Sequence, residues 1–145
     1  MIILSETQKY RLIIQNKGDN MKNKIFMSVQ ILAGLMLVVF GSNKFFGFLD
    51  MQPGSLEMGA FMMALFKSGY LMQLVAAVEI AAGVSFLLNR YAALMAVVLM
   101  PVMLNAFLVH LFLDPAGIGG ATVLLVFTVI IMFRNKERYR TILKP

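Results

Sequence analysis

Among the polar side chains within or beside the long apolar stretches of this sequence, six could carry chemistry. Their amide, ammonium, carboxyl and imidazole groups can hydrogen bond or exchange protons: Asn43, Lys44, Glu79, Asn105, His110 and Asp114. A carboxylate inside an apolar segment is costly unless it faces protein or water. We therefore expect Glu79, and the polar residues that follow it up to His110, to point into the interior of a helical bundle.

The sequence leaves two roles open for each of these groups. Glu79 could exchange a proton or bind a ligand, or it could be protonated and hydrogen bonded to a neighbouring helix. Lys44 could extend its ammonium to the membrane surface, or it could turn inward to a buried anion. His110 and Asp114 are four residues apart, about one helical turn, and could pair.

The sequence has few of the residues that metal and thiol chemistry require. It contains no Cys and a single His, which removes disulfides, thiol nucleophiles and iron–sulfur ligation. A zinc site needs three or four His, Cys or carboxylate ligands, so we predict no metal centre. No dinucleotide fingerprint and no Ser-His-Asp arrangement is visible. We predict no covalently bound cofactor, and whether the protein is an enzyme stays open.

The composition indicates a membrane protein. Hydrophobic residues make up 60% of the chain, charged residues 14%, and the mean hydropathy is +0.82, whereas soluble domains average about 25% charged residues. Four apolar stretches could cross a bilayer, at about residues 25–48, 70–88, 91–113 and 116–133. The predicted fold class is all-α, a four-transmembrane-helix bundle.

A short helix is expected between the first two spans. Pro53 and Gly54 predict a turn, and an apolar stripe with helical spacing follows, at Met58, Phe61, Met62, Leu65 and Phe66. About twelve residues are too few to cross a bilayer. We expect this helix to lie along the membrane surface or to cover the mouth of the bundle.

Three further residues are expected to have structural roles. Gly41 and Gly83 offer small surfaces for close helix packing. Pro101 removes one helical hydrogen bond and predicts a kink, and Asn105 could take up the backbone group that is freed.

The distribution of charge predicts the orientation. Of 13 Lys and Arg residues, five precede the first span, five follow the fourth, and Arg90 lies between the second and third. The positive-inside rule then places both termini and the turn at Asn89 in the cytoplasm, in a plasma or inner membrane. The basic residues that give the chain its net charge of +6 lie at the ends of apolar runs. We therefore predict a lipid bilayer as partner and no nucleic acid.

This topology brings the polar residues to one side. Lys44, Asn43, His110 and Asp114 would lie near the outer face, and Glu79 about 14 Å from the outer end of its span. We therefore predict one outward-facing polar pocket with Glu79 at its floor. Residues 1–20 are interpreted as an N-terminal tail or upstream extension, and residues 21–145 as a single transmembrane domain.

Four segments, in this order, resemble the DoxX family of small four-helix membrane proteins. They are residues 41–48 (GSNKFFGF), Glu79 in a helix of small apolar residues, residues 101–105 (PVMLN) and residues 110–115 (HLFLDP). The resemblance covers about residues 24–140. The loop at residues 50–57 is less rich in proline than the family pattern, and residues 1–20 fall outside it.

The resemblance implies a link to redox chemistry. The family takes its name from a small subunit associated with thiosulfate:quinone oxidoreductase, and other members are linked to membrane redox and oxidative-stress complexes. The expected function is a small subunit or anchor of a quinone-linked system, with a redox partner subunit and a quinone as the cofactor class. The alternatives are a transporter or carrier of a small molecule or lipid, and a purely structural partner subunit. Self-association into a homo-oligomer is also considered.

Overall fold

A computed structural model describes residues 6–140, and their regular structure is entirely helical. The elements are α1 (Glu6–Phe46), α2 (Leu56–Lys67), α3 (Leu71–Leu87), α4 (Ala92–Leu113), the short 3-10 helix η1 (Pro115–Gly117), α5 (Ile118–Arg134) and α6 (Lys136–Tyr139). The predicted all-α fold class is confirmed.

The helices provide three to four candidate membrane spans. α1, α4 and the segment Pro115–Arg134 are each long and apolar enough to cross a bilayer. α3 has 17 residues and qualifies together with α2, from which it is bent by 91°. Seventeen residues rise about 26 Å, close to the hydrocarbon thickness of about 30 Å, and α3 packs along α1. The predicted spans agree with these helices except at the start of α1.

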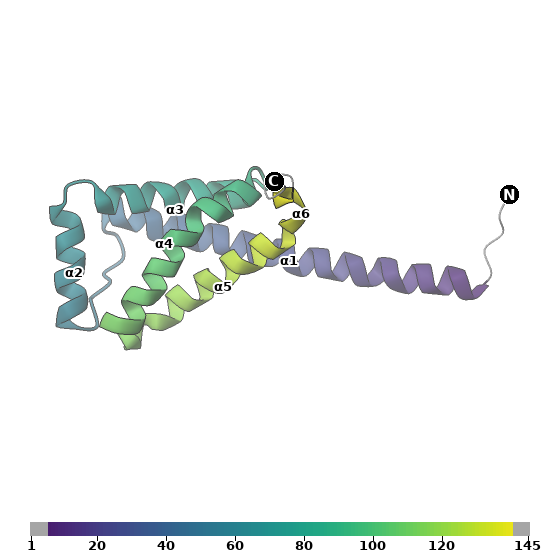
Figure 1. The fold of residues 1–145 in the computed structure, drawn as a ribbon, viewed down its shortest axis with the longest axis horizontal. Coiled ribbons are helices and arrows are strands. Elements are labelled where there is room, and N and C mark those ends of the chain that lie inside the picture. Colours follow the sequence, from purple (N-terminus) through teal and green to yellow (C-terminus); the bar gives the residue numbers. More distant parts are fainter. Residues whose placement is uncertain (1–5, 141–145) are drawn as a thin grey trace.

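α1 extends well beyond the span expected at residues 25–48. It begins at Glu6 and continues without a break to Phe46, so its first half projects from the bundle (Figure 1). Residues 6–20 are thus helical and continuous with the span. Residues 1–5, and Lys144 among the predicted basic residues, lie outside the described part of the chain. The interpretation of residues 1–20 as an upstream extension stays a prediction.

The bundle consists of two helix pairs. α1 packs mainly along α3, α4 packs mainly along α5, and contacts of α3 with α4 and of α1 with α5 join the pairs. α2 crosses one end of this arrangement (Figure 1). We call that end the α2 end. The opposite end carries the turn between α3 and α4 together with α6, and we call it the Asn89 end.

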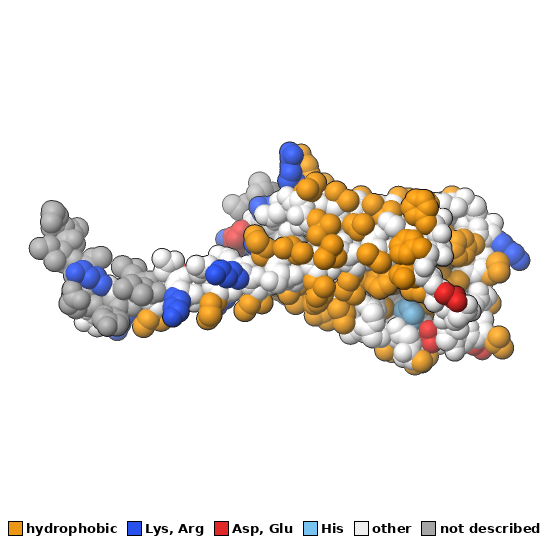
Figure 2. Space-filling view, turned by 180° about the vertical axis from the view of Figure 1, so that it is seen from behind, with side chains coloured by type: hydrophobic (Ala, Val, Ile, Leu, Met, Phe, Trp, Pro, Cys, Tyr) orange, Lys and Arg blue, Asp and Glu red, His pale blue; other side chains and the backbone are white. Residues whose placement is uncertain are grey.

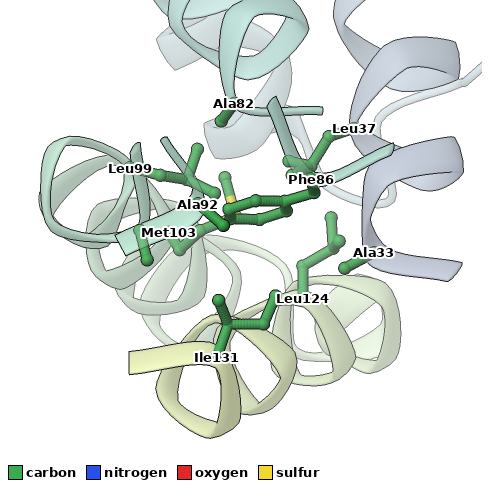
Figure 3. Packing of buried hydrophobic residues seen from close by; sticks show 10 residues of the cluster. Ala33, Leu37, Ala82, Phe86, Ala92, Leu99, Met103, Leu124 and Ile131 are labelled. Atoms are coloured by element: carbon green, nitrogen blue, oxygen red, sulfur yellow. The ribbon is translucent and has the colours of Figure 1, made fainter. Parts of the chain in front are cut away.

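The hydrophobic core is centred on Phe86, which is 1% exposed. Its ring lies among side chains from α1, α3, α4 and α5 (Figure 3). The buried members are Ala33, Leu37, Ala82, Phe86, Ala92, Ala96, Leu99, Met103, Leu124 and Ile131. Because most of them come from the second half of α3, the first half of α4 and the second half of α5, the core lies toward the Asn89 end.

The outside of the bundle is also apolar. Hydrophobic side chains form a broad band over its surface, and Lys and Arg side chains lie on the projecting part of α1 and beyond the band (Figure 2). A soluble protein buries most such side chains, whereas the surface of a membrane span contacts lipid. The band therefore fits the hydrocarbon layer of a bilayer.

α1 and α3 approach each other closely because glycines lie in their interface. A Cβ at Gly83 would lie 2.8 Å from the carbonyl oxygen of Gly34, and one at Gly41 would lie 2.8 Å from the Cγ1 of Ile80. Distances this short leave no room for a side chain. The glycines thus allow main chain to touch main chain, which is the usual means of close packing between membrane helices.

A polar cluster closes the Asn89 end. The buried Gln30 of α1 donates through Nε2 to the carbonyl oxygen of Phe86 (2.8 Å) and to Oδ1 of Asn89 (3.0 Å). Arg134 of α5 donates to the Oε1 of Gln30 (3.4 Å). The Tyr139 hydroxyl donates to the carbonyl of α4 residue 93 (2.8 Å), and partial burial raises the pKa of this phenol. The bonds of Gln30 join α1, α3 and α5, and the bond of Tyr139 joins α6 to α4.

The glycine contact can be tested by adding a single methyl group. We expect Gly83→Ala to lower the free energy of unfolding by about 1–2 kcal/mol, because the new Cβ meets the backbone of α1. Gly120→Ala on α5 is the matched control, since nothing lies within 4 Å of its Cβ position; it should be neutral or gain up to about 1 kcal/mol from helix propensity. Thermal unfolding in mild detergent measures both. Equal losses in the two variants would contradict the close contact.

Candidate functional site

The most distinctive polar contact joins α1 to α3. The Nζ of Lys44, in the last turn of α1, lies 2.6 Å from the Oε2 of Glu79 in the middle of α3. The side chains are 21% and 7% exposed, respectively. Nζ also lies 3.5 Å from the carbonyl oxygen of Phe40, which accepts a second, longer hydrogen bond. Lys44 thus turns inward to an anion.

The local sequence explains why these two side chains meet. Gly41 lies three residues before Lys44, on the same face of α1. A Cβ at Gly41 would lie 3.2 Å from the Cβ of Glu79. The missing side chain therefore lets α3 approach at the position of the carboxylate, and the ammonium one turn further along α1 reaches it.

Asn43 bonds the chain that follows α1. Its Nδ2 donates to the carbonyl oxygen of Leu49 (3.2 Å), and its Oδ1 accepts from the Leu49 amide (2.6 Å). These two bonds close the turn in which Gly47 has a φ of +61°, a conformation that suits glycine. Asn43 is 9% exposed, and its amide fixes the start of the loop that leads to α2.

A second pair forms at the end of α4. The Nδ1 of His110 lies 3.5 Å from the Oδ2 of Asp114, and the Asp114 side chain is 8% exposed. This distance is within ion-pair range, but His110 Nδ1 has no hydrogen-bond partner among the described residues. Gly54 and Gly117 crowd the carboxylate so closely that a Cβ on either would collide with it. Asp114 is thus enclosed by backbone.

The end of the loop at residues 47–55 is tied to α4. Ser55 donates through its hydroxyl to the carbonyl oxygen of Leu113, and the same hydroxyl accepts from the Met58 amide (3.0 Å) as the N-cap of α2. The bond to Leu113 therefore fixes the point at which α2 begins. Together with the bonds of Asn43, it holds both ends of the loop across the α2 end of the bundle.

The structure groups four of the six predicted site residues into two separate pairs. Lys44 pairs with Glu79, and His110 with Asp114. Within residues 6–140, no hydrogen bond or ion pair joins one pair to the other. A groove of about 790 Å³ at the α2 end is lined by residues 52–56, Gly59, Ala60 and Met63, none of which is a predicted site residue. Whether the two pairs form a ligand site stays a prediction.

The expectation that Asn105 points into the bundle is wrong for this chain. Asn105 is exposed, as is Pro101 one turn earlier, and α4 continues through the proline. The buried positions of α4 include Leu99 and Met103, and residue 105 lies about 200° around the helix from residue 103. A membrane helix is apolar on all sides, so its sequence did not show which face would be buried.

Sequence reasoning missed the cluster around Gln30. Gln30 is 3% exposed and bonds two groups at the end of α3, but it was not among the six polar residues singled out from the sequence. The signal was present, since Gln30 is an uncharged polar residue within an apolar stretch. No group of three or more His, Cys, Asp or Glu residues in the described part of the chain could hold a metal ion.

The helices and the buried ion pair define a class, namely an integral membrane protein with several spans. The family model described as DoxX matches residues 27–111, more than half of the chain, from the membrane part of α1 to near the end of α4. The chain belongs to the DoxX family. No curated protein and no solved structure matches it.

The ion pair can be tested with a double-mutant cycle. We expect Glu79→Leu and Lys44→Met each to destabilise the protein, because each leaves the other charge unpaired at membrane depth. Fully buried pairs lose about 3–5 kcal/mol in this way, and the partial exposure of Lys44 should make the loss smaller. The double variant should recover most of it. Thermal unfolding in detergent provides the measurement, with the exposed Glu57→Gln as control. Additive losses in the double variant would show that the two side chains do not interact.

Proposed function

We propose that this DoxX-family protein is a small subunit or anchor of a quinone-linked membrane redox system, in which Lys44 and Glu79 bind the head group of a quinone-like molecule. The electron-carrying centre would belong to a partner subunit. The supporting observation is the contact of 2.6 Å between a partly exposed ammonium and a buried carboxylate inside an apolar bundle.

The hydrogen bonds of Lys44 leave one donor for a ligand. An ammonium has three N–H groups, and two are directed to Glu79 and to the carbonyl oxygen of Phe40. The third can donate to a quinone carbonyl, which only accepts hydrogen bonds. Because the Lys44 side chain is 21% exposed, a head group could reach it without unpacking the bundle.

Glu79 supplies the complementary chemistry. Reduction of a quinone to a quinol takes up two electrons, which the centre of the partner subunit would supply, and two protons. A carboxylate that takes up a proton can pass it on to a reduced oxygen and be protonated again, so Glu79 could relay the protons one at a time. Glu79 is buried, with a side chain that is 7% exposed. It lies eight residues after Leu71, about 12 Å into α3, at a depth where an isoprenoid tail can remain in lipid.

Quinone binding can be measured by photolabelling. With an azidoquinone in nanodiscs, and decylubiquinone as competitor, we expect Lys44→Met to reduce competed labelling about tenfold or more, because it removes the charged donor to the quinone carbonyl. We expect Glu79→Gln to reduce it as well, because the carboxylate that holds the Lys44 ammonium in place is lost. Lys67→Met is the matched control, since this lysine is exposed at the end of α2. His110→Phe tests the second pair: reduced labelling would join it to the site, and unchanged labelling would confine the site to Lys44 and Glu79.

The alternatives predict different results. Labelling that stays the same in Lys44→Met and Glu79→Gln would reject quinone binding at the ion pair. Flux of a solute in proteoliposomes, abolished by the same substitutions, would indicate a transporter that uses the pair. A stable partner without either property would indicate a structural subunit. The quinone proposal also states that this chain binds neither haem nor flavin. A purified protein whose visible absorption shows either cofactor in a stoichiometric amount would contradict it.

We further propose that both termini and the turn at Asn89 are cytoplasmic and that the α2 end faces outward. Single cysteines can report this orientation, because the sequence contains none. In intact cells we expect cysteines at Asn89 and Asn135 to resist an impermeant maleimide and one at Gln52 to react. Permeabilised cells are the control in which all three should react. Labelling at Asn135 in intact cells would reverse the orientation.

A further inference from the structure

One face of α4 is unpartnered and carries a regular side-chain pattern. Within the broader exposed surface of α4, one line of six residues is spaced at intervals of 4, 3, 4, 3 and 4: Leu94, Val98, Pro101, Asn105, Leu108 and Phe112. Alternating steps of three and four are the heptad spacing by which one helix packs along another. In that pattern, Val98, Asn105 and Phe112 occupy equivalent positions, the a positions of the heptad.

Asn105 is the residue that distinguishes this face from an ordinary lipid surface. Its side chain makes no hydrogen bond with any described residue, and it lies eight residues, about 12 Å, inside the end of α4 at Leu113. No water is available at this depth to replace a missing partner, so an unpaired amide is costly. Pro101, on the same face, also leaves the carbonyl of Val97 without its helical donor.

We propose that this face of α4 binds α4 of a second copy of the chain, with Asn105 pairing with Asn105 across a two-fold axis. An amide both donates and accepts, so two identical side chains can satisfy each other. Copies of a membrane protein share one orientation, so a two-fold axis along the membrane normal places residue 105 of both chains at the same depth. The two α4 helices then run parallel.

The heptad position of Asn105 fits this arrangement. In parallel two-stranded packing, an Asn at a single a position specifies register and a dimeric state. The apolar residues on either side, Val98 and Phe112, would meet their counterparts one heptad away. The surface is separate from Lys44 and Glu79, because those residues lie between α1 and α3, so the proposal does not depend on quinone binding.

Disulfide crosslinking in native membranes tests the dimer. With Asn105 retained, Val98→Cys should crosslink readily to a second copy under mild oxidation. Val126→Cys on α5 and Leu74→Cys on α3 are the matched controls, since their side chains are comparably exposed but face elsewhere, and they should not crosslink.

The role of the amide is tested in the same background. Adding Asn105→Leu to Val98→Cys should weaken dimerisation about tenfold, measured by dilution in lipid, because it removes the pair of interhelical hydrogen bonds. Asn105→Gln, which keeps the amide, should retain most of the association. Leucine suits a lipid-facing position, so loss of folding would not explain a weaker dimer.

Three results would overturn the proposal. Crosslinking at Val126 equal to that at Val98 would show random collision. Unchanged association in Asn105→Leu would show that the amide does not hold the dimer. A monomer by subunit counting in native membranes, with residue 105 crosslinking instead to a different protein, would assign the face to another partner.

Discussion

The structure depends on the pairing of two opposite charges at membrane depth. A single ammonium or carboxylate in hydrocarbon is costly, so Lys44 and Glu79 must lie within contact distance for either to be tolerated, and their atoms are 2.6 Å apart. This distance requires α1 and α3 to touch, which Gly34, Gly41 and Gly83 permit. The glycines and the charges are therefore one constraint: a bulkier residue at the crossing would separate the helices and leave both charges unpaired.

The two ends of the bundle differ in the side chains that hold them together. The hydrophobic core around Phe86 and the bonds of Gln30 lie toward the Asn89 end. The α2 end instead carries the two charged pairs and a loop that is held at its margins by Asn43 and Ser55. A ligand could therefore displace side chains at the α2 end while the packed core keeps the helices in place.

The sequence predicted the helices and the inward position of Glu79, but not the faces of the other helices. Length and hydropathy are sufficient to place spans, and the cost of a buried charge is sufficient to place a carboxylate. The same reasoning failed for Asn105, because it assumed that a polar side chain in a span must find its partner within its own chain, whereas Asn105 lies on the outer face. In α2, Met58 was expected on the apolar stripe and is the buried residue of that helix. α4 is apolar on all sides and offers no such stripe. The spacing of four predicted that His110 and Asp114 could pair, but not that this pair lies apart from Lys44.

The two proposals fit one assembly because they use different faces. Lys44 and Glu79 lie at the contact of α1 with α3, whereas Asn105 lies on the outer face of α4. A dimer through Asn105 would therefore carry two ion-pair sites, one in each copy. Asn105 would hold the two copies together, and the pair of Lys44 and Glu79 would remain available for a quinone head group. A neutral amide suits the permanent contact, because it can be satisfied by its own copy, whereas a charged pair with one free donor suits a ligand that enters and leaves.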